Sequence, residues 1–348
     1  MSGISPAPPV VPVFSPRAAA SPISAQSQLS NGAEELTFGR TSSPRNRRQE
    51  ISKSLPQHDR LARVKQVLAM MRMSATAEQR YPRIQLLARR AAQAQGDLAA
   101  ALLEEGASPE ECMLALQMAL DAEADGAKDD PQRRQRILDA QQSLDEDYGE
   151  IIRGRLAALE VSLESNVPPS EIAAFQDGYV ALLLGNGSFV GLIDDILKRF
   201  QRRLRHALTL MKRALGAELD SHWPSCDPEY LLLLMQMLAE ASAISTVLDE
   251  CEELCEKWHK GSKLNVNDPV QLTRDLLKLS SEPWVTAYRY NKLADAYAAS
   301  RARAMFLERL RRWTRNMPDR LFYDDAARVR VDEALQEALD KEAGAEDL

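Results

Sequence analysis

The sequence predicts an all-α protein, an elongated rod of three consecutive helical bundles that follows a disordered N-terminal segment. Its 348 residues are 45% hydrophobic and 27% charged, which is enough material for two or three ordinary domains. Aromatic residues make up 5%, and the 15 Gly and 18 Pro are too few for a chain of short strands and tight turns. From residue 59 onward apolar residues recur at helical spacing, and no stretch sustains the period of two that strands need.

Proline and charge divide the chain near residue 56. The first 56 residues hold eight of the 18 prolines, and their six basic and three acidic side chains give a balance of +3. The other 292 residues therefore carry 38 basic and 48 acidic side chains, a balance of −10. Because nucleic-acid binding needs an excess of Lys and Arg to displace counterions, we expect no nucleic-acid partner.

Residues 1–56 form the first predicted segment. Residues 1–30 contain seven Ser, six Pro and five Ala, which give a chain little to bury, so we expect disorder. No Sec signal is expected, because the first basic residue is Arg17 and Pro12 interrupts the early apolar run. Residues 34–56 place four apolar side chains along a basic strip, a pattern that suits capture by a partner supplying the missing core. These anchors are Leu36, Phe38, Ile51 and Leu55. A terminus without a role, with anchors spaced by chance, is the alternative.

The cysteines and the apolar runs indicate which cellular compartment suits the protein and whether it spans a membrane. The four cysteines, at positions 112, 226, 251 and 255, lack the spacing of a disulfide framework, which indicates a reducing compartment. The longest nearly apolar run, residues 230–239, is too short to span a bilayer. The sequence therefore predicts no transmembrane segment.

Residues 57–150 are predicted to form the first bundle. After an initial helix, a second begins at Pro82 and runs through Leu102, and Gly106 followed by Ser108 ends it and caps the next. Pro131 then begins a helix of about 33 residues, roughly 50 Å long. Because that is longer than one small bundle needs, we expect this helix to link two bundles.

Residues 151–262 are predicted to form the second bundle. A helix from Ser170 ends at the Gly-rich turn 185–188, and the apolar stripe from Ile193 to Leu215 predicts one amphipathic helix of about seven turns. A further helix is expected from Pro228 to Lys260.

Residues 263–348 are predicted to form the third bundle. It begins near Asn267 and contains a helix around Phe306 and Trp313, followed by a break at Met317-Pro318. The last predicted helix carries an apolar stripe of Val329, Ala334, Leu335 and Leu339.

The sequence predicts no enzyme, no cofactor and no metal, because no constellation meets the required geometry. Cys251, Cys255 and His259 share one side of a helix, but residues at i and i+8 lie about 12 Å apart and cannot both bind one zinc ion. The Gly-rich stretch 185–191 has neither the preceding strand nor the following Lys-Ser/Thr of a phosphate loop.

Arginines are dense between positions 301 and 320. They interleave with Phe306 and Trp313, so the simplest interpretation is a core-facing stripe with a solvated cationic face opposite. A surface for an acidic protein partner is the second interpretation, and nucleic acid is least favoured because no recognition motif accompanies the run. In the second interpretation the partner-binding residues are Arg309, Arg312 and Arg315.

Three stretches of this chain resemble one known family. Residues 179–189 (YVALLLGNGSF) with 196–200 (ILKRF), and residues 214–231 (ALGAELDSHWPSCDPEYL), are similar to its central helices. Residues 306–322 (FLERLRRWTRNMPDRLF), with Trp284 before them and 334–340 (ALQEALD) after, resemble its TyeA-like end. The family is that of the type III secretion gatekeepers, the HrpJ/YopN/InvE/MxiC proteins. Glu218 departs from the Asp of the family pattern.

The resemblance implies X-bundle-like helical bundles and a non-enzymatic regulator at the base of the secretion apparatus in the bacterial cytoplasm. It implies that the protein favours translocator export, blocks effectors until host contact, and is itself secreted. The implied partners are secretion chaperones, the cytoplasmic domain of the export gate and translocator–chaperone complexes. Residues 1–56 would then hold the secretion signal and the chaperone-binding strip. A cytosolic scaffold with a disordered tether, unconnected with secretion, stays open as the alternative.

Overall fold

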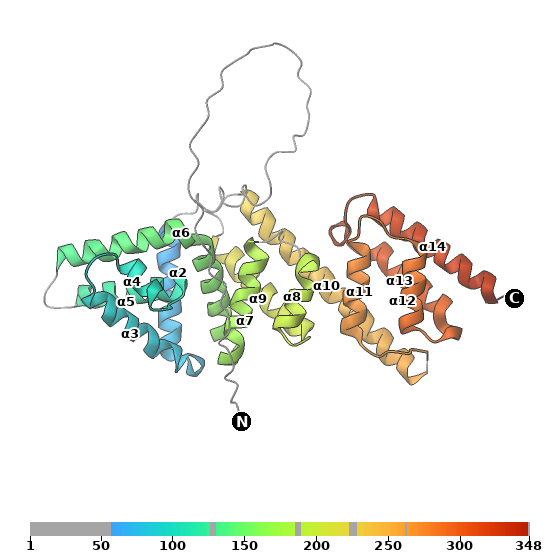
Figure 1. The fold of residues 1–348 in the computed structure, drawn as a ribbon, viewed down its shortest axis with the longest axis horizontal. Helices are drawn as coiled ribbons and strands as arrows, with labels where there is room; N and C mark the ends of the chain where they lie inside the picture. Colours follow the sequence, from blue (N-terminus) through green and yellow to red (C-terminus); the bar gives the residue numbers. More distant parts are fainter. Residues whose placement is uncertain (1–56, 126–129, 185–188, 223–227, 262, 347–348) are drawn as a thin grey trace, which may run out of the picture. The chain divides into compact units, whose positions relative to one another are not determined.

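The computed structural model describes residues 57–346, except 126–129, 185–188, 223–227 and 262, and over this part of the chain it is helical (Figure 1). Thirteen α-helices, α2 to α14, and three short 3₁₀ turns cover the described residues, and the single β-type contact among them is an isolated bridge between Leu264 and Ala298. The predicted all-α class is confirmed. The four predicted anchors Leu36, Phe38, Ile51 and Leu55 lie outside the described residues.

The first group of helices packs around α6. Its members are α2 (Gln57–Met73), α3 (Arg80–Gln93), α4 (Leu98–Glu104), α5 (Pro109–Asp125) and α6 (Pro131–Glu164). Helix α5 lies against α3 and α6, and α2 lies against α5 and α6. Fully buried Val67, Ile84 and Leu114 come from three of these helices and form one core, which holds the group together by apolar burial.

One predicted helix of this group is wrong. Residues 82–102 do not form a single helix, because the chain leaves the helical path between α3 and α4. Gly96 has φ of 91°, a left-handed conformation that costs Gly little, and the Asp97 side chain then caps α4 by accepting from the amide of Ala100. The apolar spacing continues through the break, which is why periodicity alone predicts one helix.

Helix α6 contacts helices that come before it and helices that come after it in the chain. Asp130 caps its start, Pro131 occupies the first turn, and after 34 helical residues the chain turns at Asn166, whose φ is 50°. It contacts α2, α4 and α5, and also α7 and α9. Gly154 permits the approach to α7, since a Cβ there would lie 2.9 Å from a methyl of Leu183. The side chains from Ile152 to Leu163 are buried almost without interruption, since neighbours surround this part of the helix.

The second group contains α7 (Pro169–Leu184), α8 (Phe189–Arg199), α9 (Leu204–His222) and α10 (Pro228–Lys260). Here the predicted seven-turn helix 193–215 is wrong, because α8 ends at Arg199 and α9 begins at Leu204. Gln201 and Arg202 have φ of 49° and 66°, and the Arg202 amide donates to the carbonyl of Leu197 at 2.7 Å. Phe200 at this corner is buried, with its ring centroid 6.4 Å from that of Phe175 in α7. The corner thus adds to the core instead of interrupting it.

The third group contains α11 (Pro269–Ser280), α12 (Ala287–Tyr297), α13 (Arg303–Asn316) and α14 (Ala327–Glu346). Helix α10 extends to it, lying against α9 and α11 and placing Trp258 6.3 Å from Phe306 of α13 between ring centroids. The break at Met317-Pro318 is confirmed, but the predicted stripe of α14 is wrong at Val329, which is 58% exposed. Val331 is buried instead, two positions later.

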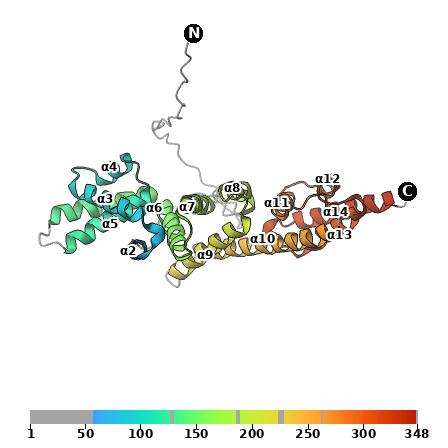
Figure 2. The same cartoon turned by 90° about the horizontal axis from the view of Figure 1, so that it is seen from below.

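Helix α10 is the one described helix long and apolar enough, by length and composition, to cross a membrane. Its buried side chains include Leu234, Met237 and Ile244, and it packs along α9 and α11 (Figure 2). Glu240 in the same helix accepts a hydrogen bond from the buried amide of Val190. The same length and composition also fit a core helix shared by two groups. The absence of a transmembrane segment stays a prediction.

Candidate partner-binding surface

The three predicted arginines of α13 do not form one surface. The Arg309 guanidinium lies 3.4 Å from Glu250 of α10, and Arg315 lies 2.7 Å from Asp332 of α14. Among the residues that the structure describes, Arg312 pairs with Glu308 of its own helix alone, at 3.7 Å, and its side chain is 62% exposed. The helix therefore uses two of the three charges to hold its neighbours and presents the third to solvent.

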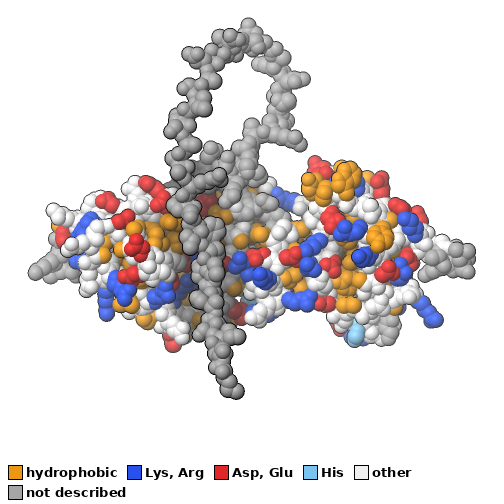
Figure 3. All heavy atoms as spheres, in the orientation of Figure 1, with side chains coloured by type: hydrophobic (Ala, Val, Ile, Leu, Met, Phe, Trp, Pro, Cys, Tyr) orange, Lys and Arg blue, Asp and Glu red, His pale blue; other side chains and the backbone are white. Residues whose placement is uncertain are grey.

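The carboxylate of Asp332 anchors α13 to α14. Arg311 donates to it at 2.9 Å and Arg315 at 2.7 Å, and the two guanidinium groups hold the pKa of that carboxyl well below its ordinary value. Much of the positive charge predicted for this helix is thus neutralised within the chain, and the space-filling view shows basic and acidic side chains interspersed (Figure 3). A broad cationic face is absent from the described part of α13.

A groove of about 320 Å³ between α10 and α13 brings two of the predicted residues together. Leu254, Trp258 and Met305 supply apolar surface in it, and Met305 is 47% exposed. Arg309 and Arg312 line it together with Glu253, Lys257 and Glu308. The sequence analysis missed the α10 side of this groove, although Leu254 and Trp258, four residues apart, share one face of a predicted helix. Protein interfaces commonly combine an apolar centre with a polar rim, and the groove has the same arrangement of residues.

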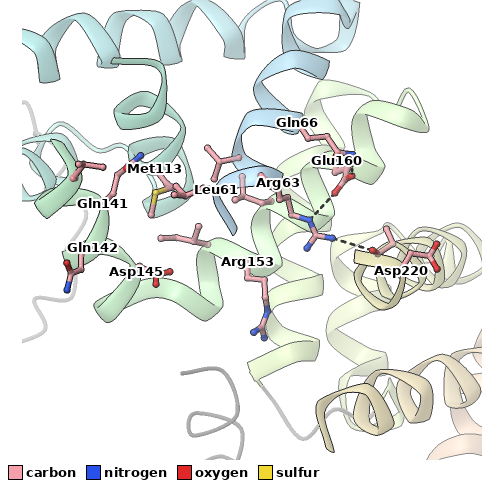
Figure 4. Close-up of a pocket in the computed structure, with 16 residues that line it drawn as sticks. Leu61, Arg63, Gln66, Met113, Gln141, Gln142, Asp145, Arg153, Glu160 and Asp220 are labelled. Atoms are coloured by element: carbon pink, nitrogen blue, oxygen red, sulfur yellow. Dashed lines mark hydrogen bonds and ion pairs between the residues drawn. The ribbon is translucent and has the colours of Figure 1, made fainter. Parts of the chain in front are cut away.

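A larger pocket of about 600 Å³ lies where α2, α5, α6 and α9 meet (Figure 4). Arg63 of α2 points toward Glu160 of α6, at 3.1 Å, and also donates to the carbonyl of Ala217 in α9 at 3.4 Å. Gln66 donates to the same Glu160 at 2.6 Å. These polar contacts join α2 to α6 and to α9.

A buried polar network lies beside this pocket. Glu218 of α9 is fully buried, pairs with Arg153 of α6 at 3.0 Å, and accepts from the hydroxyls of Tyr179 of α7, at 2.7 Å, and Tyr230 of α10. The Arg153 guanidinium also lies 4.7 Å from the centre of the Tyr230 ring. One carboxylate therefore ties four helices together.

The surroundings of Glu218 favour its charged form. Burial by itself raises the pKa of this carboxyl, but the charges of Arg153 and Arg63 and the two tyrosine hydroxyls outweigh burial and lower it below the ordinary value. Glu218 is the residue that departs from the Asp of the family pattern. Its side chain is one methylene longer than that of Asp, and its carboxylate lies at the centre of the network. The sequence pattern singled out this position but did not show that its side chain is buried among these partners.

The thiols of α10 are packing groups. Cys251 and Cys255 are buried, and burial raises the pKa of their thiols to about 12 and about 11. At neutral pH they are protonated and weakly nucleophilic. Within the described ranges no three His, Cys, Asp or Glu side chains are placed to hold a metal ion.

Known proteins resemble this chain in two ways. Residues 270–347, which include almost all of α11 to α14, match the model of the TyeA family. HrpJ of Pseudomonas syringae pv. syringae, described as a hypersensitivity response secretion protein, is 25% identical over 162 residues. That match covers 46% of this chain and 46% of HrpJ, so less than half of this relative's length is spanned.

Solved structures resemble the fold. MxiC of Shigella flexneri superimposes with a TM-score of 0.56 at 15% identity, over 80% of this chain and 93% of MxiC. CopN of Chlamydia pneumoniae gives a TM-score of 0.45 at 17% identity, over 75% of this chain and 95% of CopN. At such low identity the likeness to MxiC shows a shared helical fold.

Proposed function

We propose that the chain is a member of the type III secretion gatekeeper family with a C-terminal TyeA domain, and that it is a non-enzymatic gatekeeper controlling the order of translocator and effector export. The observation that carries this proposal is the TyeA match over residues 270–347, on helices that pack directly against α10. HrpJ, a secretion protein by its description, and the fold shared with MxiC support it.

The proposed partners are secretion chaperones, the cytoplasmic domain of the export gate and translocator–chaperone complexes. The proposed location is the bacterial cytoplasm at the base of the apparatus, with secretion through it. Residues 1–30 supply the export signal in this proposal, because a narrow channel admits an unfolded chain. Leu36, Phe38, Ile51 and Leu55 supply the apolar contacts to a chaperone.

We propose the groove between α10 and α13 as the contact with a protein partner. Met305 and Arg312 offer an exposed apolar group and an exposed cation side by side with Trp258, a combination that protein interfaces favour. Arg309 and Arg315 also hold α13 to its neighbours, so their substitution would disturb both packing and binding. Arg312 and Met305 are therefore the better positions for a test.

The test combines gene deletion with complementation. A strain lacking the gene is expected to export effectors early and translocators poorly, and the wild-type gene restores the order. The M305D/R312E variant is expected to restore it at least tenfold less well, as loss of about 1.4 kcal/mol of binding would give. Lys341→Glu of α14 is the matched control, since Lys341 also forms an exposed pair with a Glu four residues before it. An unchanged amount and order of secreted proteins in the deletion strain would refute the gatekeeper function.

A cytosolic scaffold is the competing function, and a reporter distinguishes the two. Fusion of residues 1–30 to a reporter is expected to yield export that depends on the type III apparatus. A scaffold whose first residues are a mere tether would leave the reporter inside the cell.

A further inference from the structure

The pocket at α2, α5, α6 and α9 has an apolar side, in which Met113, Ile152 and Leu156 are buried while Leu61 and Leu138 are partly accessible. Leu61 of α2, Met113 of α5 and Ile152 and Leu156 of α6 line it, and Leu138 at its edge is 36% exposed. Its volume of about 600 Å³ is in the range of sites that bury ligand side chains. An apolar side chain that entered the pocket would cover the surface that Leu61 and Leu138 still expose, which hydrophobic burial favours.

We propose that this pocket binds residues 45–56 of the same chain. This stretch directly precedes α2, whose second turn supplies Leu61 to the pocket wall. Ile51 and Leu55 lie ten and six residues before Leu61. Helix α2 begins at Gln57, two residues after Leu55 and six after Ile51, and six extended residues reach up to about 20 Å, so the Ile51 side chain can reach the pocket without movement of the helices.

Charge favours the same occupant. Residues 45–56 carry Arg45, Arg47, Arg48 and Lys53 against the single Glu50. The two arginines that line the pocket are already engaged, Arg63 by Glu160 and Arg153 by Glu218.

The rim of the pocket is acidic. Asp220 of α9 lines it, and Glu146 of α6 adjoins it by accepting from the pocket residue Gln142 at 2.9 Å. Neither Glu146 nor Asp220 forms an ion pair with a residue that the structure describes. A basic, sparsely apolar segment therefore matches both the apolar side and the rim.

Residues 45–56 of the same chain are favoured as the occupant over a second copy of the chain, because they are covalently attached next to the pocket. A short tether holds residues 45–56 near the pocket at an effective concentration of millimolar order, well above that of a second molecule in the cell. Ile51 and Leu55 are also two of the four anchors proposed for a chaperone, so docking in the pocket and chaperone binding would exclude each other. The docking itself holds whether or not the chain regulates secretion.

Photo-crosslinking in the full-length protein tests the proposal. A benzophenone side chain at position 51 is expected to form adducts within one chain on the walls of the pocket, in α2, α6 or α9, and the same probe at position 38 is not. Adducts outside the pocket, or only between two chains, would overturn it. Mass spectrometry distinguishes these outcomes.

Charge exchange supplies an independent readout. R47E/R48E and E146R/D220R are each expected to lower the adduct yield about threefold, as two exposed ion pairs would, and the combined variant to restore it. Glu337→Arg in α14 is the control, because it makes the same change from an acidic to a basic side chain away from the pocket. Equal adduct yields in all variants, at unchanged thermal stability, would contradict a contact between the basic residues of 45–56 and the acidic rim of the pocket.

Discussion

At the scale of single residues, one buried carboxylate organises the centre of the molecule. Glu218 receives an ion pair and two hydroxyl hydrogen bonds from three other helices. A buried ion pair contributes little compared with an apolar replacement, because desolvation offsets its attraction. Removal of one partner is different, since it leaves the other charge buried without compensation.

Glu218→Leu is therefore expected to lower the free energy of unfolding by about 3–5 kcal/mol, because it leaves the Arg153 charge buried. Tyr179→Phe removes one neutral donor and is expected to cost about 1–3 kcal/mol. Urea denaturation followed by circular dichroism measures both. A loss below about 1 kcal/mol for Glu218→Leu, in a variant of unchanged helix content, would contradict the central role of this residue.

At the scale of elements, helices end at residues with a left-handed backbone conformation, even where the apolar spacing of the sequence continues. The stripe 193–215 continues in register across two left-handed residues, and the chain turns there because buried Phe200 packs on α7. Left-handed conformation costs a residue with a Cβ roughly 1–2 kcal/mol. The contacts of the corner must outweigh that cost.

Gln201→Gly tests this account of the corner between α8 and α9. Gln201 is exposed, has φ of 49°, and its side chain forms no hydrogen bond with a residue that the structure describes. We expect a stability gain of about 0.5–1 kcal/mol, because Gly avoids the Cβ strain while losing more entropy on folding. Gln201→Ala is the control and should give no gain. Equal thermal midpoints for the Gly and Ala variants would show that strain at this position is negligible.

At the scale of the whole molecule, two long helices join successive groups. Helix α6 contacts both the first and the second group, and α10 contacts both the second and the third. Because Trp258 and Leu254 of α10 face the last group, the TyeA-like end is part of a continuous helical body. A partner bound to the last group would thus contact or move one end of α10, and the other end of α10 lies in the second group of helices.

A chain ending at Gly261 is expected to have a lower melting temperature than the full-length protein and to bind more of a hydrophobic dye, because the apolar face around Trp258 loses its cover. Thermal denaturation and dye fluorescence measure the two effects. Point substitutions are for this reason better tests of binding than truncation. An unchanged melting temperature would mean that the last group folds independently of α10.

The sequence by itself determined the helical class, the long helix that begins at Pro131, and the family resemblance, because these depend on local spacing and short motifs. Only the tertiary structure decided the breaks at Gly96 and Gln201, the pairing of Arg309 and Arg315 within the chain, and the groove between α10 and α13. It also decided that Glu218 lies at the centre of a buried network. Residues that meet in space from separate helices leave no periodic signal along the chain, and their partners become visible only when the helices are packed.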